Sequence, residues 1–194
     1  MTKLLFSNLA IAITLLAFVP YILQIFKGKV RPHVISWLIW GISTMVIFIA
    51  QILDGAGVGA WPIGVSAALT LCVALLAFLH RADTQIDRKD KLAFIGTMLA
   101  LPIWYVTAEP LYAVLILTLV DLSGFIPTLR KINRDPYSES VIFFALFAIR
   151  NLLVLLALEH YSAVTMLFPA AIGLACLAII INMFIRRNQM VVSE

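Results

Sequence analysis

Seven apolar segments restrict the folds open to this chain more than any other feature of its sequence. We place them at residues 4–26, 33–53, 58–79, 92–106, 111–131, 140–158 and 163–185. A helix rises 1.5 Å per residue, so about 20 apolar residues cross the roughly 30 Å of hydrocarbon in a bilayer. All but the fourth segment have this length or nearly so. Lipid offers no partner for exposed backbone groups, so the sequence predicts an all-α integral membrane protein with seven transmembrane helices.

Composition supports this placement in a bilayer. Hydrophobic residues make up 63% of the 194 residues and charged residues 12%. One soluble core of this size cannot bury so much apolar surface. The first segment is long for a signal peptide, and a similar segment recurs deep in the chain, so we expect it to stay as a helix.

The chain also repeats itself at an offset of 107 residues. Residues 15–78 align with 122–185 without a gap, and 11 of the 64 pairs are identical. The aligned pairs include two pairs of prolines and three tryptophans that each meet a phenylalanine: Pro20/Pro127, Pro62/Pro169, Trp37/Phe144, Trp40/Phe147 and Trp61/Phe168. Such a register indicates a duplicated unit, an architecture typical of transporters that hold their substrate between the copies.

Basic residues predict the orientation. Twelve of the fourteen lysines and arginines follow the first, third, fifth and seventh segments, and all of these lie on one side: Lys27, Lys29, Arg31, Arg81, Arg88, Lys89, Lys91, Arg130, Lys131, Arg134, Arg186 and Arg187. By the positive-inside rule this side is cytoplasmic, so the N-terminus is predicted outside and the C-terminus inside. The bias explains the net charge of +4 without a nucleic-acid partner.

The repeat and the orientation together predict a 3+1+3 architecture. A three-helix unit ends on the face opposite its start, so one linker helix is needed before a parallel second copy. We expect the first repeat at residues 1–80, a cytoplasmic loop and the linker helix at 81–108, and the second repeat at 109–194.

Two stretches carry a family resemblance: Phe18-Val-Pro-Tyr-Ile-Leu-Gln-Ile-Phe-Lys-Gly-Lys29 and Phe125-Ile-Pro-Thr-Leu-Arg-Lys-Ile-Asn-Arg134. Each places a proline in the inner half of the first helix of its repeat and a short basic loop after it. With the 3+1+3 pattern, this resembles the SWEET and PQ-loop transporter superfamily over nearly the whole chain. The resemblance implies a transporter with parallel repeats. It also allows a membrane sorting receptor, because related folds bind a peptide without carrying it across.

Pro20 and Pro127 are the predicted gating residues. Each lies about two turns from the predicted cytoplasmic end of its helix, where the missing amide hydrogen and the crowded ring loosen the helix. Paired kinks would let one end of a pore narrow while the other opens. The alternative is a tolerated kink with no gating role.

Asp121 and Arg150 are charged residues within apolar segments, at about the same predicted depth. An unpaired charge in lipid costs several kcal/mol, so we expect the two to form an ion pair in at least one state. The alternatives are a purely structural pair, or a functional one in which Asp121 takes up a proton or Arg150 binds an anionic group. The first repeat has Thr14 and Ser43 at the aligned positions.

Helical spacing predicts a substrate-binding face. Trp37, Trp40 and Thr44 stand at i, i+3 and i+7, and the alignment places Phe144, Phe147 and Asn151 on the matching face of the second repeat. Aromatic and hydrogen-bonding side chains near the midplane suit a small polar ligand. The predicted substrate-binding residues are Trp37, Trp40, Ser43, Thr44, Phe147, Arg150 and Asn151. Trp37 is also open to a role as an interfacial anchor.

Other chemistry has little support. Cys72 and Cys176 fit small core residues, and the three histidines fall near loops on different faces. The sequence has no motif of a hydrolase, a metalloprotease or a nucleotide-binding loop. We therefore expect no enzyme activity, no cofactor and no metal.

The sequence favours an integral membrane transporter in a prokaryotic inner (plasma) membrane, with the C-terminus of the chain in the cytoplasm. We expect it to move a small polar, sugar-like metabolite by alternating access, as a passive uniporter. The alternatives are a proton-coupled amino-acid or vitamin-like transporter that uses Asp121, and a sorting receptor of the same fold. A homo-oligomer stays open, although one chain already contains a complete pair of repeats.

Overall fold

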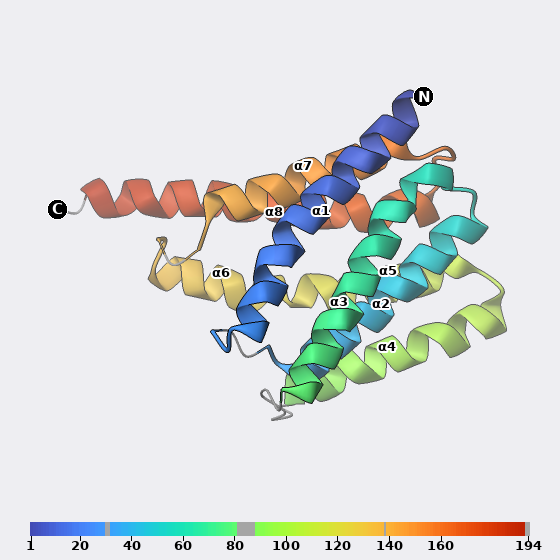
Figure 1. Ribbon diagram of the computed structural model, residues 1–194, viewed down its shortest axis with the longest axis horizontal. Helices are drawn as coiled ribbons and strands as arrows, with labels where there is room; N and C mark the ends of the chain where they lie inside the picture. Colours follow the sequence, from blue (N-terminus) through green and yellow to red (C-terminus); the bar gives the residue numbers. More distant parts are fainter. Residues whose placement is uncertain (30–31, 81–87, 138, 193–194) are drawn as a thin grey trace.

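The computed structural model describes residues 1–29, 32–80, 88–137 and 139–192, and all regular structure in these ranges is helical (Figure 1). The elements in chain order are α1 (Thr2–Phe26), α2 (Val34–Leu53), the 3₁₀ helix η1 (Gly57–Gly59), α3 (Trp61–Leu79), α4 (Arg88–Thr107), α5 (Pro110–Ser123), α6 (Phe125–Arg134), α7 (Val141–Ala157) and α8 (Ala163–Val192). Residues 81–87 of the predicted cytoplasmic loop and the basic residue Arg31 lie outside the described residues.

Five helical stretches in the described ranges are long and apolar enough to cross a membrane: Thr2–Phe26, Val34–Leu53, Gly57–Leu79, Pro110–Arg134 and Ala163–Gln189. Phe94–Thr107 and Val141–Ala157 are shorter apolar helices. Large apolar side chains also cover the outside of the bundle; Leu16 and Leu53, for example, are each 71% exposed. These findings confirm the expected all-α membrane protein at the level of fold class.

Contacts at the two ends of the bundle show that consecutive long helices alternate in direction. At the end that holds the N-terminus, Lys3 Nζ donates to the Leu158 carbonyl at 2.7 Å and Ser7 Oγ to the Val58 carbonyl at 2.6 Å. At the other end, Arg186 Nε donates to Asn133 Oδ1 at 3.1 Å. We call these ends the N-terminal end and the basic end, because the described residues among the twelve clustered lysines and arginines lie at or near the latter.

Helix pairing follows a regular scheme. α2 packs closely on α3, and α7 packs closely on α8. α1 lies against α3 and α7, whereas α5 lies against α8 and α2. Small residues permit the closest approaches: a Cβ at Gly41 of α2 would meet Leu71 of α3, and a Cβ at Gly173 of α8 would meet Asn151 of α7. α4 packs on α5 and α2 and lies at the edge of the bundle (Figure 1).

The predicted fifth segment, 111–131, is not one continuous helix. It consists of α5 and α6, which are separated at Gly124. Proline at position 127 has no amide hydrogen for the carbonyl of Ser123, so the helical ladder loses a bond at this point. At the same break, the Gly124 amide donates to the Asp121 carbonyl, three residues back, at 3.1 Å, so the chain makes a tighter turn than an α-helix. The two pieces continue in about the same direction (Figure 1).

Two further boundaries differ from the prediction. α4 begins at Arg88 rather than near residue 92, and α8 continues to Val192 rather than ending near residue 185. The longer α8 has partners outside the apolar core: Arg187 Nε donates to the Pro136 carbonyl at 3.0 Å, and the Arg187 guanidinium lies over the Tyr137 ring. These contacts hold the loop between α6 and α7 against α8.

Candidate functional site

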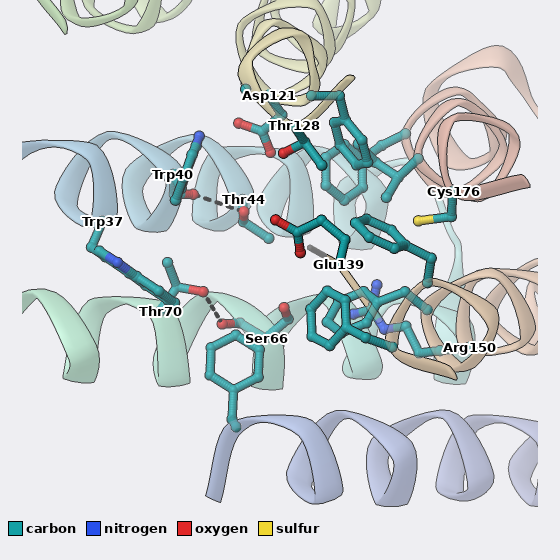
Figure 2. Close-up of a pocket in the computed structure, with 18 residues that line it drawn as sticks. Trp37, Trp40, Thr44, Ser66, Thr70, Asp121, Thr128, Glu139, Arg150 and Cys176 are labelled. Carbon is teal, nitrogen blue, oxygen red and sulfur yellow. Dashed lines mark hydrogen bonds between the residues drawn. The ribbon is translucent and has the colours of Figure 1, made fainter. Parts of the chain in front are cut away.

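A cavity of about 360 Å³ lies inside the bundle (Figure 2). Its lining comes from α1, α2, α3, α5, α6, α7 and α8, with the loop before α7. No described residue of α4 lines it. The cavity therefore lies where the two predicted three-helix units meet, and the predicted linker helix stays outside it.

Aromatic rings form most of the cavity wall. Eight of the lining residues are aromatic: Phe18, Trp37, Trp40, Phe125, Phe143, Phe144, Phe147 and Phe168. They come from α1, α2, α6, α7 and α8, so rings surround the space from several helices. Such a wall buries apolar or planar parts of a ligand.

Trp37 lies at the centre of an aromatic cluster that forms part of this wall. Its ring stacks on Tyr21 at a centroid distance of 5.1 Å and meets Phe18 edge to face at 6.2 Å. It also meets Trp40 edge to face at 5.8 Å. Because Phe18 and Tyr21 flank Pro20, this cluster connects the proline turn of α1 to α2.

Hydroxyl groups supply polar points on the wall. Thr44 donates to the Trp40 carbonyl at 2.7 Å, and Thr70 donates to the Ser66 carbonyl at 2.8 Å (Figure 2). Each donates its hydrogen to its own helix, so its oxygen still offers lone pairs as an acceptor. Ser66 and Thr128 add two more hydroxyls.

Arg150 is the cationic residue of the wall. It is only 3% exposed, and its guanidinium makes three hydrogen bonds within the protein. Nε donates to Thr14 Oγ1 of α1 at 3.2 Å, Nη1 to Asn151 Oδ1 at 3.1 Å, and Nη2 to the Pro62 carbonyl of α3 at 2.9 Å. All three acceptors are neutral. The contacts hold α7 against both α1 and the first turn of α3.

Asp121 also lines the cavity, from the last turn of α5. Its Oδ1 is buried and has no hydrogen-bond partner among the described residues. No ion pair joins Asp121 to Arg150 in the described part of the chain, and Figure 2 shows the two side chains on different sides of the cavity. The reason is helix placement: α7 packs on α8 and α1, whereas α5 packs on α4, α8 and α2. Segments adjacent in sequence are not adjacent here, and a pair in another state stays a prediction.

The predicted substrate-binding residues fall into two groups in the structure. The cavity wall includes Trp37, Trp40, Thr44, Phe147 and Arg150. Ser43 and Asn151 are behind it. Ser43 Oγ lies 3.3 Å from Thr97 Oγ1 of α4, and Asn151 donates to the Phe147 carbonyl at 2.8 Å while it accepts from Arg150. Asn151 thus orients Arg150.

The two predicted gating prolines have unequal surroundings. Pro20 lies within the continuous helix α1, while position 127 lies three residues after the break between α5 and α6. The side chain of Pro127 lies outside the described part of the structure. The alignment explains the difference: Gly124 corresponds to Ala17, and Trp40 occupies the space beside Gly124, where a Cβ would lie 3.2 Å from the indole.

Several lining residues are not among the predicted ones, notably Ser66, Thr70, Glu139 and Cys176. The first two were detectable, because they are hydroxyl residues one turn apart on an otherwise apolar helix. Glu139 belongs to the loop before α7, so the cavity reaches the basic end of the bundle. Both cysteines were predicted to be core residues. Cys176 is buried, at 2% exposure, on the inner face of α8, whereas Cys72 of α3 is exposed, so the prediction is wrong for Cys72.

Polar contacts close the opposite end. Asp54 accepts a hydrogen bond from Ser162 and lies 3.6 Å from His160 Nδ1. The Val58 amide donates to Glu159 at 3.3 Å. With the Lys3 and Ser7 bonds, these contacts join α1 and the α2–α3 connection to the α7–α8 connection. We call this group the N-terminal seal.

Compared with known proteins, the chain matches no protein-family model, no curated protein and no solved structure.

Proposed function

We propose that this protein is a membrane carrier that moves a small polar metabolite by alternating access. The observation that carries the proposal is the cavity, which reaches the basic end through Glu139 while polar contacts close the N-terminal end. A site that is closed at one end and lies between two helix units is the arrangement that alternating access requires.

Equivalent helix contacts support the 3+1+3 architecture within this proposal. The α2–α3 pair corresponds to α7–α8, and the α1–α3 pair corresponds to α5–α8. Between the units, α1 lies on α7 as α5 lies on α2. A pseudo-two-fold axis along the membrane normal would relate these contacts, with the cavity between the middle helices α2 and α7. The resemblance to the SWEET and PQ-loop superfamily fits this scheme and is part of the proposal.

Charge supports the proposed orientation. The basic end would face the cytoplasm and the N-terminus would face outward. In that orientation the cavity faces inward, in a prokaryotic inner membrane. Opening to the outside would require the N-terminal seal to separate and the aromatic cluster around Trp37 to close the basic end.

Reconstitution into liposomes tests the carrier directly. We expect purified protein to equilibrate one class of small polar solute across the liposome membrane, and uptake to stop when the concentrations are equal, as passive uniport requires. Protein-free liposomes are the control. If none of a panel of sugars, amino acids and nucleosides equilibrates, the carrier is contradicted and a sorting receptor of the same fold is favoured.

Asp121 favours a second candidate, proton-coupled transport. Its buried Oδ1 has no hydrogen-bond partner in the part of the chain that the structure describes, and a proton would give the carboxyl group a donor of its own. In this case an inward proton gradient should drive accumulation above the outside concentration. Asp121→Asn should abolish accumulation and leave exchange at equal concentrations. Accumulation that is unchanged in Asp121→Asn would exclude Asp121 as the coupling residue.

A further inference from the structure

Asp121 brings an uncompensated negative charge to the cavity wall. Its Oδ1 is buried and accepts no hydrogen bond from the described residues. Figure 2 shows Asp121 on the side of the cavity where Trp40 and Thr44 lie, with Arg150 on another side. A buried carboxylate without a counterion is costly, and an acidic side chain kept inside a membrane protein marks a pathway for a substrate or an ion.

The internal repeat identifies what Asp121 lacks. Asp121 aligns with Thr14, and Arg150 aligns with Ser43. Where α1 packs on α7, Arg150 Nε donates to Thr14 Oγ1 at 3.2 Å. Where α5 packs on α2, the place of the arginine is taken by Ser43, whose Oγ lies 3.3 Å from Thr97 Oγ1 of α4. The first of these helix contacts therefore contains a cationic donor, whereas Ser43 cannot supply one to Asp121.

The other charged residues of the wall already have partners. The Arg150 guanidinium donates to three neutral acceptors of the protein: Thr14 Oγ1, Asn151 Oδ1 and the Pro62 carbonyl. Glu139 also interacts with another group. The carboxylate of Asp121 is thus the charged group of the wall that a ligand can best complement.

The surroundings of Asp121 favour an organic cation over a metal ion. No group of three or more His, Cys, Asp or Glu side chains that could hold a metal ion occurs in the described ranges. Aromatic rings form most of the wall instead, and one of them lies close to Asp121. A Cβ on Gly124 would lie 3.2 Å both from the Asp121 carbonyl and from the Trp40 ring, so the indole packs on the turn that carries Asp121. The face of an indole attracts an organic cation.

Hydroxyl groups of the wall add acceptors for such a ligand. Thr44 and Thr70 donate their hydrogens to the carbonyls of Trp40 and Ser66, so their oxygens are left as acceptors only. A cation that carries N–H groups has donors for these oxygens and for Asp121. A sugar also has donors, but it has no charge to pair with the carboxylate.

From these contacts we propose that the cavity binds a small organic cation of the amidinium or protonated-amine type, with its charge on Asp121 and a planar apolar body against the rings. The inference rests on the carrier function proposed above, because it names the substrate class of the same cavity.

Three planar probes of nearly equal size test the charge. At neutral pH benzamidine is a cation, benzamide is neutral and benzoate is an anion. Isothermal titration calorimetry on the purified wild-type protein in detergent measures their dissociation constants. We expect benzamidine to bind at least about tenfold more tightly than benzamide, as the loss of one charged hydrogen-bonded contact predicts, and benzoate to bind more weakly still.

The same titrations can overturn the proposal in three ways. Benzamide or benzoate that binds as tightly as benzamidine would show that the positive charge adds nothing. L-phenylalanine that binds more tightly than benzamidine would favour an amino acid. No binding of benzamidine at millimolar concentration would exclude the class.

One variant assigns the charge to its residue. Asp121→Asn keeps the size of the side chain but removes its charge, so it should weaken benzamidine at least about tenfold and leave benzamide unchanged. Glu109→Gln, the same change at an exposed position before α5, should alter neither. An Asp121→Asn variant that keeps the wild-type preference for benzamidine overturns the assignment, and the wild-type probe series decides if the variant does not fold.

Binding and transport fail separately when benzamidine is added to the solute panel of the liposome experiment. Tight binding of benzamidine with no exchange of any solute would contradict the carrier but keep the ligand class. Exchange of a neutral or anionic solute, with no binding of benzamidine, would contradict the ligand class but keep the carrier.

Discussion

At the scale of single residues, Thr14 and Arg150 join the two halves of the bundle. Thr14 Oγ1 donates to the Ala10 carbonyl at 2.8 Å and accepts from Arg150 Nε at 3.2 Å. Helices in lipid gain little from hydrophobic association, so close packing and hydrogen bonds between helices hold them together.

Thr14→Val should therefore destabilise the protein by about 1–2 kcal/mol, because it removes one charged hydrogen bond from a buried guanidinium. Thr118→Val is the matched control: Thr118 is also buried, and it donates one turn back to the Val114 carbonyl at 2.6 Å. Denaturant unfolding in detergent measures both. An equal loss of unfolding free energy in the two variants would show that the bond from Arg150 adds nothing to the stability that a buried threonine gives its own helix.

Sequence reasoning found part of the site at this scale. The repeat alignment and the helical spacing led to Trp37, Trp40, Thr44 and Phe147, because a shared helix face is encoded by period alone. The role of Asn151 was not readable, since spacing cannot tell a lining amide from one that orients its neighbour. The positions of Asp121 and Arg150 depend on which helices pack together, which the order of the segments does not determine, so their pairing in another state stays a prediction.

At the scale of elements, the break between α5 and α6 is the main departure from a straight bundle. It combines three features: the missing amide hydrogen at position 127, the glycine at 124, and Trp40 packed beside that glycine. The first repeat has Ala17 and a continuous α1 in the equivalent place. The prolines were visible in sequence, but the effect of each depends on the neighbouring residue and its contacts.

Removing the break should slow transport. Pro127→Ala restores an amide hydrogen for the Ser123 carbonyl and favours one continuous helix, so one conformational state gains stability. We expect a fall in exchange rate of about tenfold, which corresponds to about 1.4 kcal/mol. Pro20→Ala should have a smaller effect, since α1 has no break to close. Exchange in proteoliposomes measures both, with melting temperature as the check on folding. An equal effect of the two prolines would argue for a symmetric gate, and no effect of either would make both tolerated kinks.

A Cβ at position 124 tests the same joint from its packing side. Gly124→Ala would bring a methyl group to 3.2 Å from Trp40, so the indole must shift by a few tenths of an ångström. We expect slower exchange and altered tryptophan fluorescence. Ala17→Gly, at the equivalent repeat position, is the matched control and should leave the fluorescence unchanged. If Gly124→Ala behaves like the wild type in both measurements, Trp40 is free to move and the joint is not tightly packed.

At the scale of the whole molecule, the cavity and the N-terminal seal define one conformational state. The lining extends from Phe168 and Arg150 in the bundle interior to Glu139 at the basic end, while Asp54, Ser162 and the neighbouring connections close the opposite end. The sequence predicted the membrane class and the helical segments, because hydropathy and length carry that information. It could not predict which end is closed, since this depends on contacts between loops about 100 residues apart.

Thiol labelling tests both the direction of the opening and the seal. The background variant carries Cys72→Ser and Cys176→Ser. In it, Thr44→Cys should react with an impermeant thiol reagent added to inverted membrane vesicles, because the cavity reaches the basic end. In intact cells the same cysteine should react at least about tenfold more slowly, because the N-terminal seal closes the other end. Ile149→Cys, at a position that is 49% exposed on the outside of the bundle, is the lipid-facing control and should react slowly from both sides.

Adding Asp54→Asn weakens the bonds from Ser162 and His160, so labelling of Thr44→Cys from outside should rise. Faster labelling in intact cells without that change would reverse the proposed orientation, and no response to Asp54→Asn would show that other contacts keep the N-terminal end closed.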